Sequence, residues 1–138
     1  MKIPGIVIAA SASGSGKTAV TMAMMKAFKN TGKKVRACKC GPDYIDPMFH
    51  REVLGIDSEN LDLYFCDRER LKERFMHHAE GAELVVTEGV MGYYDGISLD
   101  SDEASTYDVA RTLGLPVILV VPARGCLLYT SPSPRDRQ

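Results

Sequence analysis

The chain has 138 residues, a formal net charge of -1 and a pI near 6.3, with 45% hydrophobic and 25% charged residues. This length predicts a single domain, and the near-neutral charge argues against a nucleic-acid or anionic-membrane surface as partner. No apolar run approaches the roughly 20 residues of a membrane span, and residues 1–10 lack the layout of a signal peptide. We therefore expect a cytoplasmic protein whose four cysteines are reduced thiols.

Strand-like and helix-like segments alternate along the chain. Apolar, β-branched runs predict strands over residues 5–10, 34–40, 83–89 and 116–121. The last of these is apolar at consecutive positions, which is typical of a strand buried on both faces. The alternation predicts an α/β fold with a parallel sheet covered by helices on both faces. A phosphate-loop-like segment after the first strand makes this a fold of the P-loop NTPase type.

Four helices are expected between and beside these strands. The first carries an apolar stripe and ends near Gly32, the stripe consisting of Val20, Ala23, Met24, Ala27 and Phe28. A loop over residues 41–47, with Pro42 and Pro47 as breakers, precedes a short helix over 48–54. A charged helix starts at Asp67 with Leu71, Phe75 and Ala79 inward, and a fourth helix stops at Gly114.

The segment from Ser11 to Thr18 resembles a phosphate loop, since it follows a strand, precedes a helix and ends in Gly-Lys-Thr. Ser11 replaces the first glycine of the usual pattern, and the alternative interpretation is an ordinary Gly/Ser turn. We predict that Lys17 reaches the β- and γ-phosphates of a nucleotide and that the Thr18 hydroxyl ligates Mg²⁺. The predicted nucleotide-binding residues are Ser13, Gly14, Ser15, Gly16, Lys17, Thr18 and Ala19.

Carboxylates follow the second and third predicted strands, at the sheet edge where the phosphate loop is expected. Asp43 and Glu88 are candidate metal ligands together with Thr18, because Mg²⁺ prefers hard oxygen donors. Asp46 and Asp95 lie in polar loops, where a solvated surface position is the alternative. Lys39, at a strand end, is either a structural lysine or a group that stabilises charge near a γ-phosphate.

The remaining polar and aromatic residues carry weaker signals. Tyr44, Tyr93 and Tyr94 either line a pocket for a flat organic substrate or pack against the protein. The histidines have no spacing that indicates catalysis, and we interpret His77 and His78 as helix surface. Cys38 and Cys40 are interpreted as small residues packed in a strand, since no second Cys/His pair has zinc spacing.

Taken together, five segments resemble one family over residues 3–125. They are IAASASGSGKTAVTMAMM, KCGPDYIDPMFH, SENLD, TEGVMGYYDG and ASTYDVARTLGLPVILVVPARG. The family is the N-terminal synthetase domain of the cobyrinic acid a,c-diamide synthases, in the dethiobiotin-synthetase-like group of P-loop folds. The resemblance implies ATP-dependent amidation of the a and c acetate carboxylates of a corrinoid through an acyl phosphate. Carried over by position, it implies catalytic roles for Lys17, Lys39 and Glu88 and substrate contacts for Asp43, Tyr44, Ile45 and Asp95. It assigns no role to Asn60 and Asp62.

The resemblance also has departures and open points. Pro122 stands where the family usually has Asp, and the glutamine amidotransferase domain that supplies ammonia does not follow. We therefore interpret residues 1–125 as a partial synthetase domain with its sheet incomplete at the C-terminus, and residues 126–138, with Cys126, as a disordered or artefactual tail. We expect this chain alone to bind ATP weakly and to be inactive, and the full-length protein to form a homodimer. Hydrogenobyrinic acid and nickel-sirohydrochlorin stay open as substrates.

A nucleotide-switched ATPase that acts on a protein partner is the alternative function. Partition and septum-site ATPases carry a signature lysine early in the phosphate loop. This chain has Ala12 and Ser13 there, which argues against that class.

Overall fold

The strands of the sheet all run in the same direction and end at one edge. The computed structural model describes residues 4–96, 98 and 100–122. Its five-stranded sheet has the order β3-β2-β4-β1-β5, and every pair is parallel. The strands are β1 (Gly5–Ala10), β2 (Val35–Cys40), β3 (Ser58–Leu61), β4 (Leu84–Glu88) and β5 (Val117–Val120).

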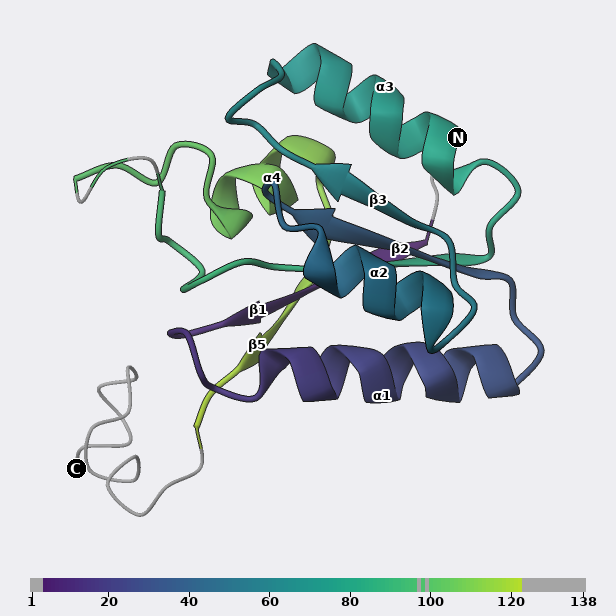
Figure 1. Ribbon diagram of the computed structural model, residues 1–138. Coiled ribbons are helices and arrows are strands. Elements are labelled where there is room, and N and C mark those ends of the chain that lie inside the picture. Colours follow the sequence, from purple (N-terminus) through teal and green to yellow (C-terminus); the bar gives the residue numbers. More distant parts are fainter. Residues whose placement is uncertain (1–3, 97, 99, 123–138) are drawn as a thin grey trace.

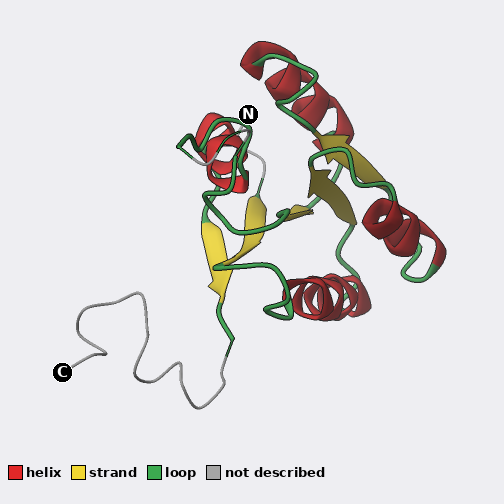
Figure 2. Ribbon diagram, turned by 60° about the vertical axis from the view of Figure 1, so that its left-hand side comes forward, coloured by secondary structure: helices red, strands yellow, loops and turns green. Residues whose placement is uncertain are grey.

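Helices cover both faces of this sheet, as predicted. They are α1 (Lys17–Asn30), α2 (Ile45–Glu52), α3 (Arg68–Ala79) and α4 (Thr106–Leu113). Figure 2 shows α1 and α2 on one face and α3 and α4 on the other. In Figure 1 the strands end on the left, where the segment between β1 and α1, the start of α2 and the loop after β4 gather. The predicted α/β fold is therefore confirmed, together with the edge at which its polar loops meet.

Side chains of β2 and β4 alternate between two separate cores, because successive residues of a strand point to opposite faces. The core under α3 and α4 contains Cys38, Cys40, Leu61, Leu71, Phe75, Ala79, Val85 and Val109. The core under α1 contains Ile8, Met25, Val35, Ala37, Ile56 and Val86. Burial of both strand faces by helices explains the apolar run of β1 and the apolar start of β4.

The sequence prediction missed strand β3 (Ser58–Leu61), which pairs with β2. Three of its four residues are polar, so it carries no apolar run. It lies at the edge of the sheet, where one side of the strand needs no partner. Its place there is set by pairing with β2 rather than by its own hydrophobicity.

Helix α2 begins earlier than predicted. It starts at Ile45, so Pro47 lies inside the helix instead of breaking the chain before it. Proline is tolerated in a first turn, where its missing N–H would have no intrahelical acceptor. Asp43 stabilises this start, because its Oδ1 accepts from the backbone N–H of Ile45 at 2.8 Å.

Two burial predictions were wrong. In α1, Ala23 and Ala27 are exposed, and the helix buries Thr21 and Met25 instead, flanked by partly buried Val20, Met24 and Phe28. In β5, Ile118 and Leu119 are 41% and 46% exposed, so this strand is not buried on both faces in the described part of the chain. The inward positions of α3 and the stop of α4 at Gly114 are confirmed.

None of the helices in the described residues is long and apolar enough to cross a membrane.

One buried carboxylate connects α3 and α4, the two helices that cover the same face of the sheet. Asp108, in the first turn of α4, is fully buried and accepts two bonds from Arg68 at the start of α3, at 2.9 and 3.0 Å. It also accepts from the backbone N–H of Ala104 at 2.9 Å. Burial raises the pKa of Asp108, but these hydrogen bonds lower it by a larger amount, so the net pKa lies below its usual value.

We predict that Asp108→Asn lowers the free energy of unfolding by about 1–3 kcal/mol, because the amide loses charge-assisted bonds in a buried place. Urea denaturation followed by circular dichroism would measure this. Glu73→Gln, on the exposed surface of α3, is the matched control and should be nearly neutral. Equal stabilities of the two variants would contradict the role of Asp108.

Candidate functional site

The segment between β1 and α1 has the backbone of a phosphate loop. Gly14 and Gly16 adopt φ of 78° and 86°, in the left-handed region that favours glycine. No atom lies within 4 Å of a Cβ built on either residue, so glycine is favoured there by its backbone conformation and not by lack of space. The loop is therefore open. Ser11 has no positive φ, which explains why serine is tolerated there. The first N–H groups of α1 follow directly, and such groups bind anions.

The first residue of α1, Lys17, reaches across to the end of β4. Its Nζ donates to the backbone oxygen of Gly89 at 2.7 Å. Lys39 Nζ donates to the same oxygen at 2.9 Å. Burial lowers the pKa of Lys17, and the nearby Lys39 lowers it further, to a net value below its usual one. The two ammonium groups therefore converge beside the phosphate loop.

Lys39 lies at the centre of a buried charge cluster. Its side chain is 2% exposed, and Nζ lies 2.6 Å from Glu88 Oε2, 2.7 Å from Asp46 Oδ2 and 3.8 Å from Asp43 Oδ2. Burial lowers the pKa of Lys39, but Glu88 and Asp46 raise it more, so the net pKa lies above its usual value. Lys39 is therefore a fully charged group held among carboxylates.

The register of the sheet produces this cluster. Lys39 and Glu88 are direct partners in the β2–β4 pairing, so their side chains leave the sheet on the same face. The preceding positions on that face, Ala37 and Val86, belong to the apolar core. Charge thus replaces hydrophobic side chains at the last position that each strand contributes to this face of the sheet.

Gly89 is held in place by close contacts. A Cβ there would lie 2.7 Å from Thr106 Cγ2 and 3.0 Å from the backbone oxygen of Ile8, so only glycine fits. Thr106 Oγ1 accepts from the N–H of Val90 at 3.0 Å. The carbonyl that receives both lysines is consequently fixed between β1 and α4.

The residues predicted to contact substrate lie around this centre in different ways. Asp43 joins the Lys39 cluster, whereas Tyr44 and Ile45 at the start of α2 are 76% and 63% exposed. Asp95 holds the loop after β4, since its Oδ2 accepts from the N–H of Gly92 at 2.8 Å. That loop is tied to β1 by Tyr93 N–H, which donates to Ala10 O at 2.8 Å.

The tyrosines of that loop pack against one another. The ring centroid of Tyr107, on α4, lies 5.6 Å from that of Tyr93 and 5.1 Å from that of Tyr94. Tyr94 still exposes 63% of its surface. The structure thus favours the packing interpretation for Tyr93 and leaves the Tyr94 ring accessible.

Asn60 and Asp62, for which the sequence offered no role, support loops. Asn60 Nδ2 donates to the backbone oxygens of Gly41 and Asp43, at 2.9 and 2.7 Å, and so holds the segment before α2. Asp62 Oδ1 accepts from the N–H of Tyr64 at 2.9 Å.

His50 is the buried residue of the site that sequence reasoning missed. Its ring is fully buried, with Nδ1 2.9 Å from Ser58 Oγ and Nε2 3.6 Å from Glu88 Oε1. One signal was available, because His50 follows Asp46 by four residues and so shares its helix face. His78 was also misplaced on the surface: it is partly buried, and its Nε2 lies 2.8 Å from Ala37 O.

The described residues contain no group of three His, Cys, Asp or Glu side chains arranged to hold a metal ion. Mg²⁺ commonly uses only one or two protein groups and takes its other ligands from phosphate and water. The exposed Thr18 and partly exposed Asp43 fit that kind of ion, whereas Glu88 is buried and bonded to Lys39.

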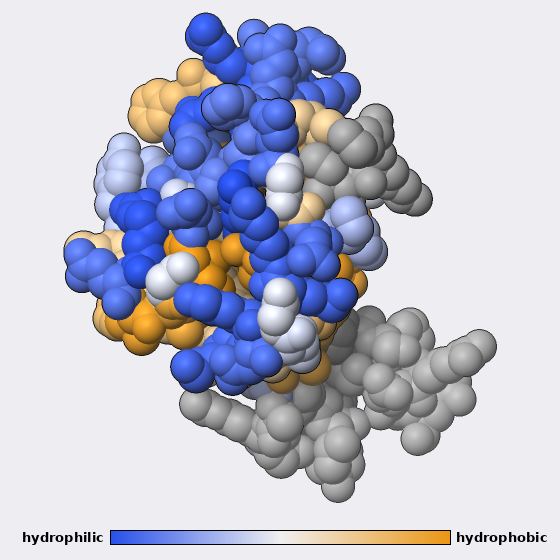
Figure 3. All heavy atoms as spheres, turned by 90° about the vertical axis from the view of Figure 1, so that its right-hand side faces the viewer, coloured by the Kyte–Doolittle hydropathy of each residue, from blue (hydrophilic) through white to orange (hydrophobic). Residues whose placement is uncertain are grey.

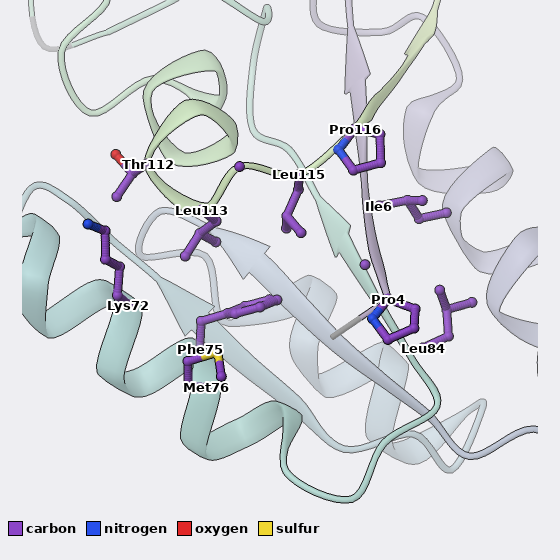
Figure 4. A pocket seen from close by; sticks show the side chains of 12 residues that line it. Pro4, Ile6, Lys72, Phe75, Met76, Leu84, Thr112, Leu113, Leu115 and Pro116 are labelled. Atoms are coloured by element: carbon purple, nitrogen blue, oxygen red, sulfur yellow. The ribbon is translucent and has the colours of Figure 1, made fainter. Parts of the chain in front are cut away.

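An apolar cavity of about 1180 Å³ lies away from this site. Figure 4 shows its lining, in which Phe75 and Met76 of α3 lie opposite Leu113 at the end of α4, Leu115 just after it and Pro4 before β1. Figure 3 views the molecule from the side where the strands begin and shows hydrophobic atoms there between hydrophilic ones. Lys72 is the one ionisable side chain in the described lining, so this cavity lacks the groups for phosphate chemistry.

The Glu88 carboxylate should make the stability of the protein depend on pH. Burial raises the pKa of Glu88, but the neighbouring His50, Asp46 and Lys39 side chains lower it by more, from 4.5 to about 2. Because the folded pKa is the lower one, the carboxylate stabilises the fold above about pH 4.5 and loses this effect as the pH falls toward 2. We predict that the stability difference between the wild type and Glu88→Gln shrinks over this range. Urea unfolding at a series of pH values would measure it, and a constant difference would contradict the prediction. Glu52→Gln, exposed at the end of α2, controls for surface charge.

Comparison with known proteins identifies relatives of this site. The chain is 49% identical over 120 residues to a cobyrinate a,c-diamide synthase of Gloeobacter violaceus, an alignment covering 87% of this chain and 26% of that protein. It is 46% identical over 125 residues to a cobyrinate a,c-diamide synthase of Thermoplasma volcanium, covering 91% and 27%. A hydrogenobyrinate a,c-diamide synthase of Streptomyces coelicolor is 47% identical over 121 residues, covering 88% and 25%. The chain thus spans about a quarter of the length of the curated relatives it matches.

The described phosphate loop agrees with the nucleotide-binding family whose model the sequence matches over residues 6–127. On this match, the chain belongs to the CobQ/CobB/MinD/ParA nucleotide binding domain family.

Proposed function

We propose that this chain is the ATP-binding part of a ligase that amidates the a and c acetate carboxylates of cobyrinic acid in cobalamin biosynthesis. The observation that carries the proposal is the convergence of Lys17 and Lys39 on one carbonyl beside an open phosphate loop. The printed names of the relatives, cobyrinate and hydrogenobyrinate a,c-diamide synthases, supply the substrate class.

The chemistry explains why ATP is needed. An oxide ion is a poor leaving group, so a carboxylate does not exchange oxygen for nitrogen directly. In the proposed reaction a carboxylate oxygen of the substrate attacks the γ-phosphorus, the bond to ADP breaks and an acyl phosphate forms. Ammonia then attacks the acyl carbon, and phosphate leaves with the electron pair of the C–O bond while a proton is released.

Each candidate residue has a part in this proposal. Lys17 and Lys39 stabilise the negative charge of the transferring phosphoryl group, and Glu88 holds the Lys39 ammonium in place. Tyr44 and Ile45 offer exposed apolar surface to the macrocycle beside Asp43. Asp95 shapes the loop that borders the phosphate site.

A magnesium ion would neutralise phosphate charge in this site, as in other phosphoryl transfers. Thr18 and Asp43 are the proposed protein ligands, because the Glu88 carboxylate is buried and bonded to Lys39. Thr18 is exposed in the first turn of α1, next to the phosphate loop. This position suits an ion that is shared with phosphate oxygens.

We also propose that glutamine supplies the ammonia through groups other than the cysteines of the described region. Release of ammonia from glutamine by a cysteine needs a thiolate. Burial raises the pKa of Cys40 to about 12 and also raises that of Cys38. Burial likewise raises the pKa of Cys66. None of the three is therefore suited to act as the nucleophile.

We predict that Lys17→Ala weakens ATP binding about tenfold or more, because an ammonium–phosphate bond is lost. Titration of the ¹⁵N-labelled chain with Mg-ATP, followed by NMR shifts of the phosphate-loop amides, would measure even weak binding. Lys26→Ala, exposed on the same helix, is the matched control. Unchanged affinity of Lys17→Ala would remove the basis for the nucleotide site.

A chimera would test the amidation itself. Residues 5–122 of this chain would replace the matched segment of the Gloeobacter violaceus relative. We expect this chimera to form ADP and amidated product from ATP, glutamine and cobyrinic acid, and the same chimera with Lys17→Ala to form neither. A folded chimera that hydrolyses ATP only with a protein partner and makes no amide would favour a nucleotide-switched ATPase instead.

A further inference from the structure

A histidine lies behind the charge cluster, on the far side of Glu88 from Lys39. His50, on α2, is fully buried, and so is the Glu88 carboxylate on β4. Lys39 Nζ binds Glu88 Oε2 at 2.6 Å, while His50 Nε2 lies 3.6 Å from the other oxygen, Oε1. The carboxylate is thus placed between an ammonium group in contact and an imidazole nitrogen just out of contact.

Two buried polar atoms in this arrangement lack hydrogen-bond partners in the described structure, and they face each other. They are His50 Nε2 and Glu88 Oε1. A separation of 3.6 Å is too long for a hydrogen bond, and buried polar atoms without partners are rare enough to need an explanation. A small movement of the carboxylate toward His50 would satisfy both atoms.

The second ring nitrogen indicates which atom carries the proton. His50 Nδ1 lies 2.9 Å from the hydroxyl of Ser58, on β3. If the hydroxyl donates to Nδ1, the neutral ring carries its proton on Nε2, which faces the Glu88 oxygen. Ser58 itself is held in β3, and its backbone oxygen accepts from Arg51 at 3.1 Å. The ring is therefore oriented through its Nδ1 atom.

Lys39 cannot bind phosphate without loosening its bonds to carboxylates. Its ammonium group contacts Glu88, Asp46 and the Gly89 oxygen. An incoming phosphate would take one or more of these donor positions. Glu88 would then remain as a buried carboxylate with a weakened partner, which is costly.

We propose that His50, oriented by Ser58, is a positioning residue that donates to Glu88 when Lys39 turns toward the phosphate of bound nucleotide. This rests on the proposed function, which puts the phosphate beside Lys39. By donating to Glu88, His50 lowers the free-energy cost of separating Lys39 from Glu88. It also keeps the Glu88 carboxylate in place while Lys39 binds phosphate. The same hydrogen bond from His50 to Glu88 fixes α2 against the end of β4. This matters because α2 also carries Asp46 and begins beside Asp43.

The tautomer of His50 is the first test. The 138-residue chain contains three histidines, so long-range ¹H–¹⁵N spectra of the histidine-labelled protein at neutral pH are simple, and His50→Gln assigns the His50 signals by their loss. We expect a proton on Nε2 and none on Nδ1. On addition of Mg-ATP we expect the Nε2 signal to shift, with the exposed His77 unchanged. A proton on Nδ1 would overturn the proposal without any variant.

A matched pair of variants tests the donor. His50→Gln keeps an N–H group near the position of Nε2, whereas His50→Asn keeps one only near Nδ1, within reach of Ser58. We expect His50→Asn to weaken Mg-ATP binding about fivefold and His50→Gln to remain within about twofold of the wild type. A general packing defect would weaken both alike, and that result would contradict the positioning role.

The two proposals fail in different ways. If Mg-ATP shifts no phosphate-loop amide of the wild type, the proposed function is wrong and the role of His50 falls with it. If those amides shift while the His50 Nε2 signal does not, the nucleotide site stands and only the His50 proposal is overturned.

Discussion

The ion pair between Lys39 and Glu88 is the interaction on which the rest of the site depends. Two unlike charges lie near the ends of neighbouring strands, in register and on the same face, next to an apolar core. Alone, either charge would be untenable there, because a buried unpaired ion is strongly destabilising. Together they form an ion pair, and its Lys39 ammonium group also contacts Asp46 of α2 and the Gly89 carbonyl. The position of α2 and of the loop after β4 follows from this pair.

Much of the fold and part of the site could be predicted from the sequence, for identifiable reasons. The long strands are buried on both faces, so their apolar runs are visible, and parallel strands bring the loops after them to one edge. This placed Lys17, Asp43 and Glu88 near one another, and their neighbourhood in the structure agrees. Ligand roles for these residues stay predictions.

What could not be predicted depends on tertiary contacts. Strand β3 is polar and exists because β2 offers it hydrogen bonds. Pro47 reads as a breaker until the helix is known to start two residues before it. His50 looks unremarkable in sequence, since its meaning comes from Ser58 and Glu88, which lie eight and thirty-eight residues away along the chain. Sequence spacing shows helix and strand faces, but not which faces meet.

The charge cluster also bears on how such a site binds nucleotide. Its lysines already have acceptors, in Glu88, Asp46 and the Gly89 carbonyl. Binding of phosphate is therefore an exchange of partners rather than the filling of an empty positive pocket. The net gain is the difference between two sets of charged hydrogen bonds, which is smaller than either set. A site of this kind gains little affinity from the exchange. Its effect is to switch the lysines from carboxylates to phosphate, and the carboxylates they leave need a new hydrogen-bond donor. The buried imidazole behind Glu88 is the group in the described structure that stands where such a donor is required.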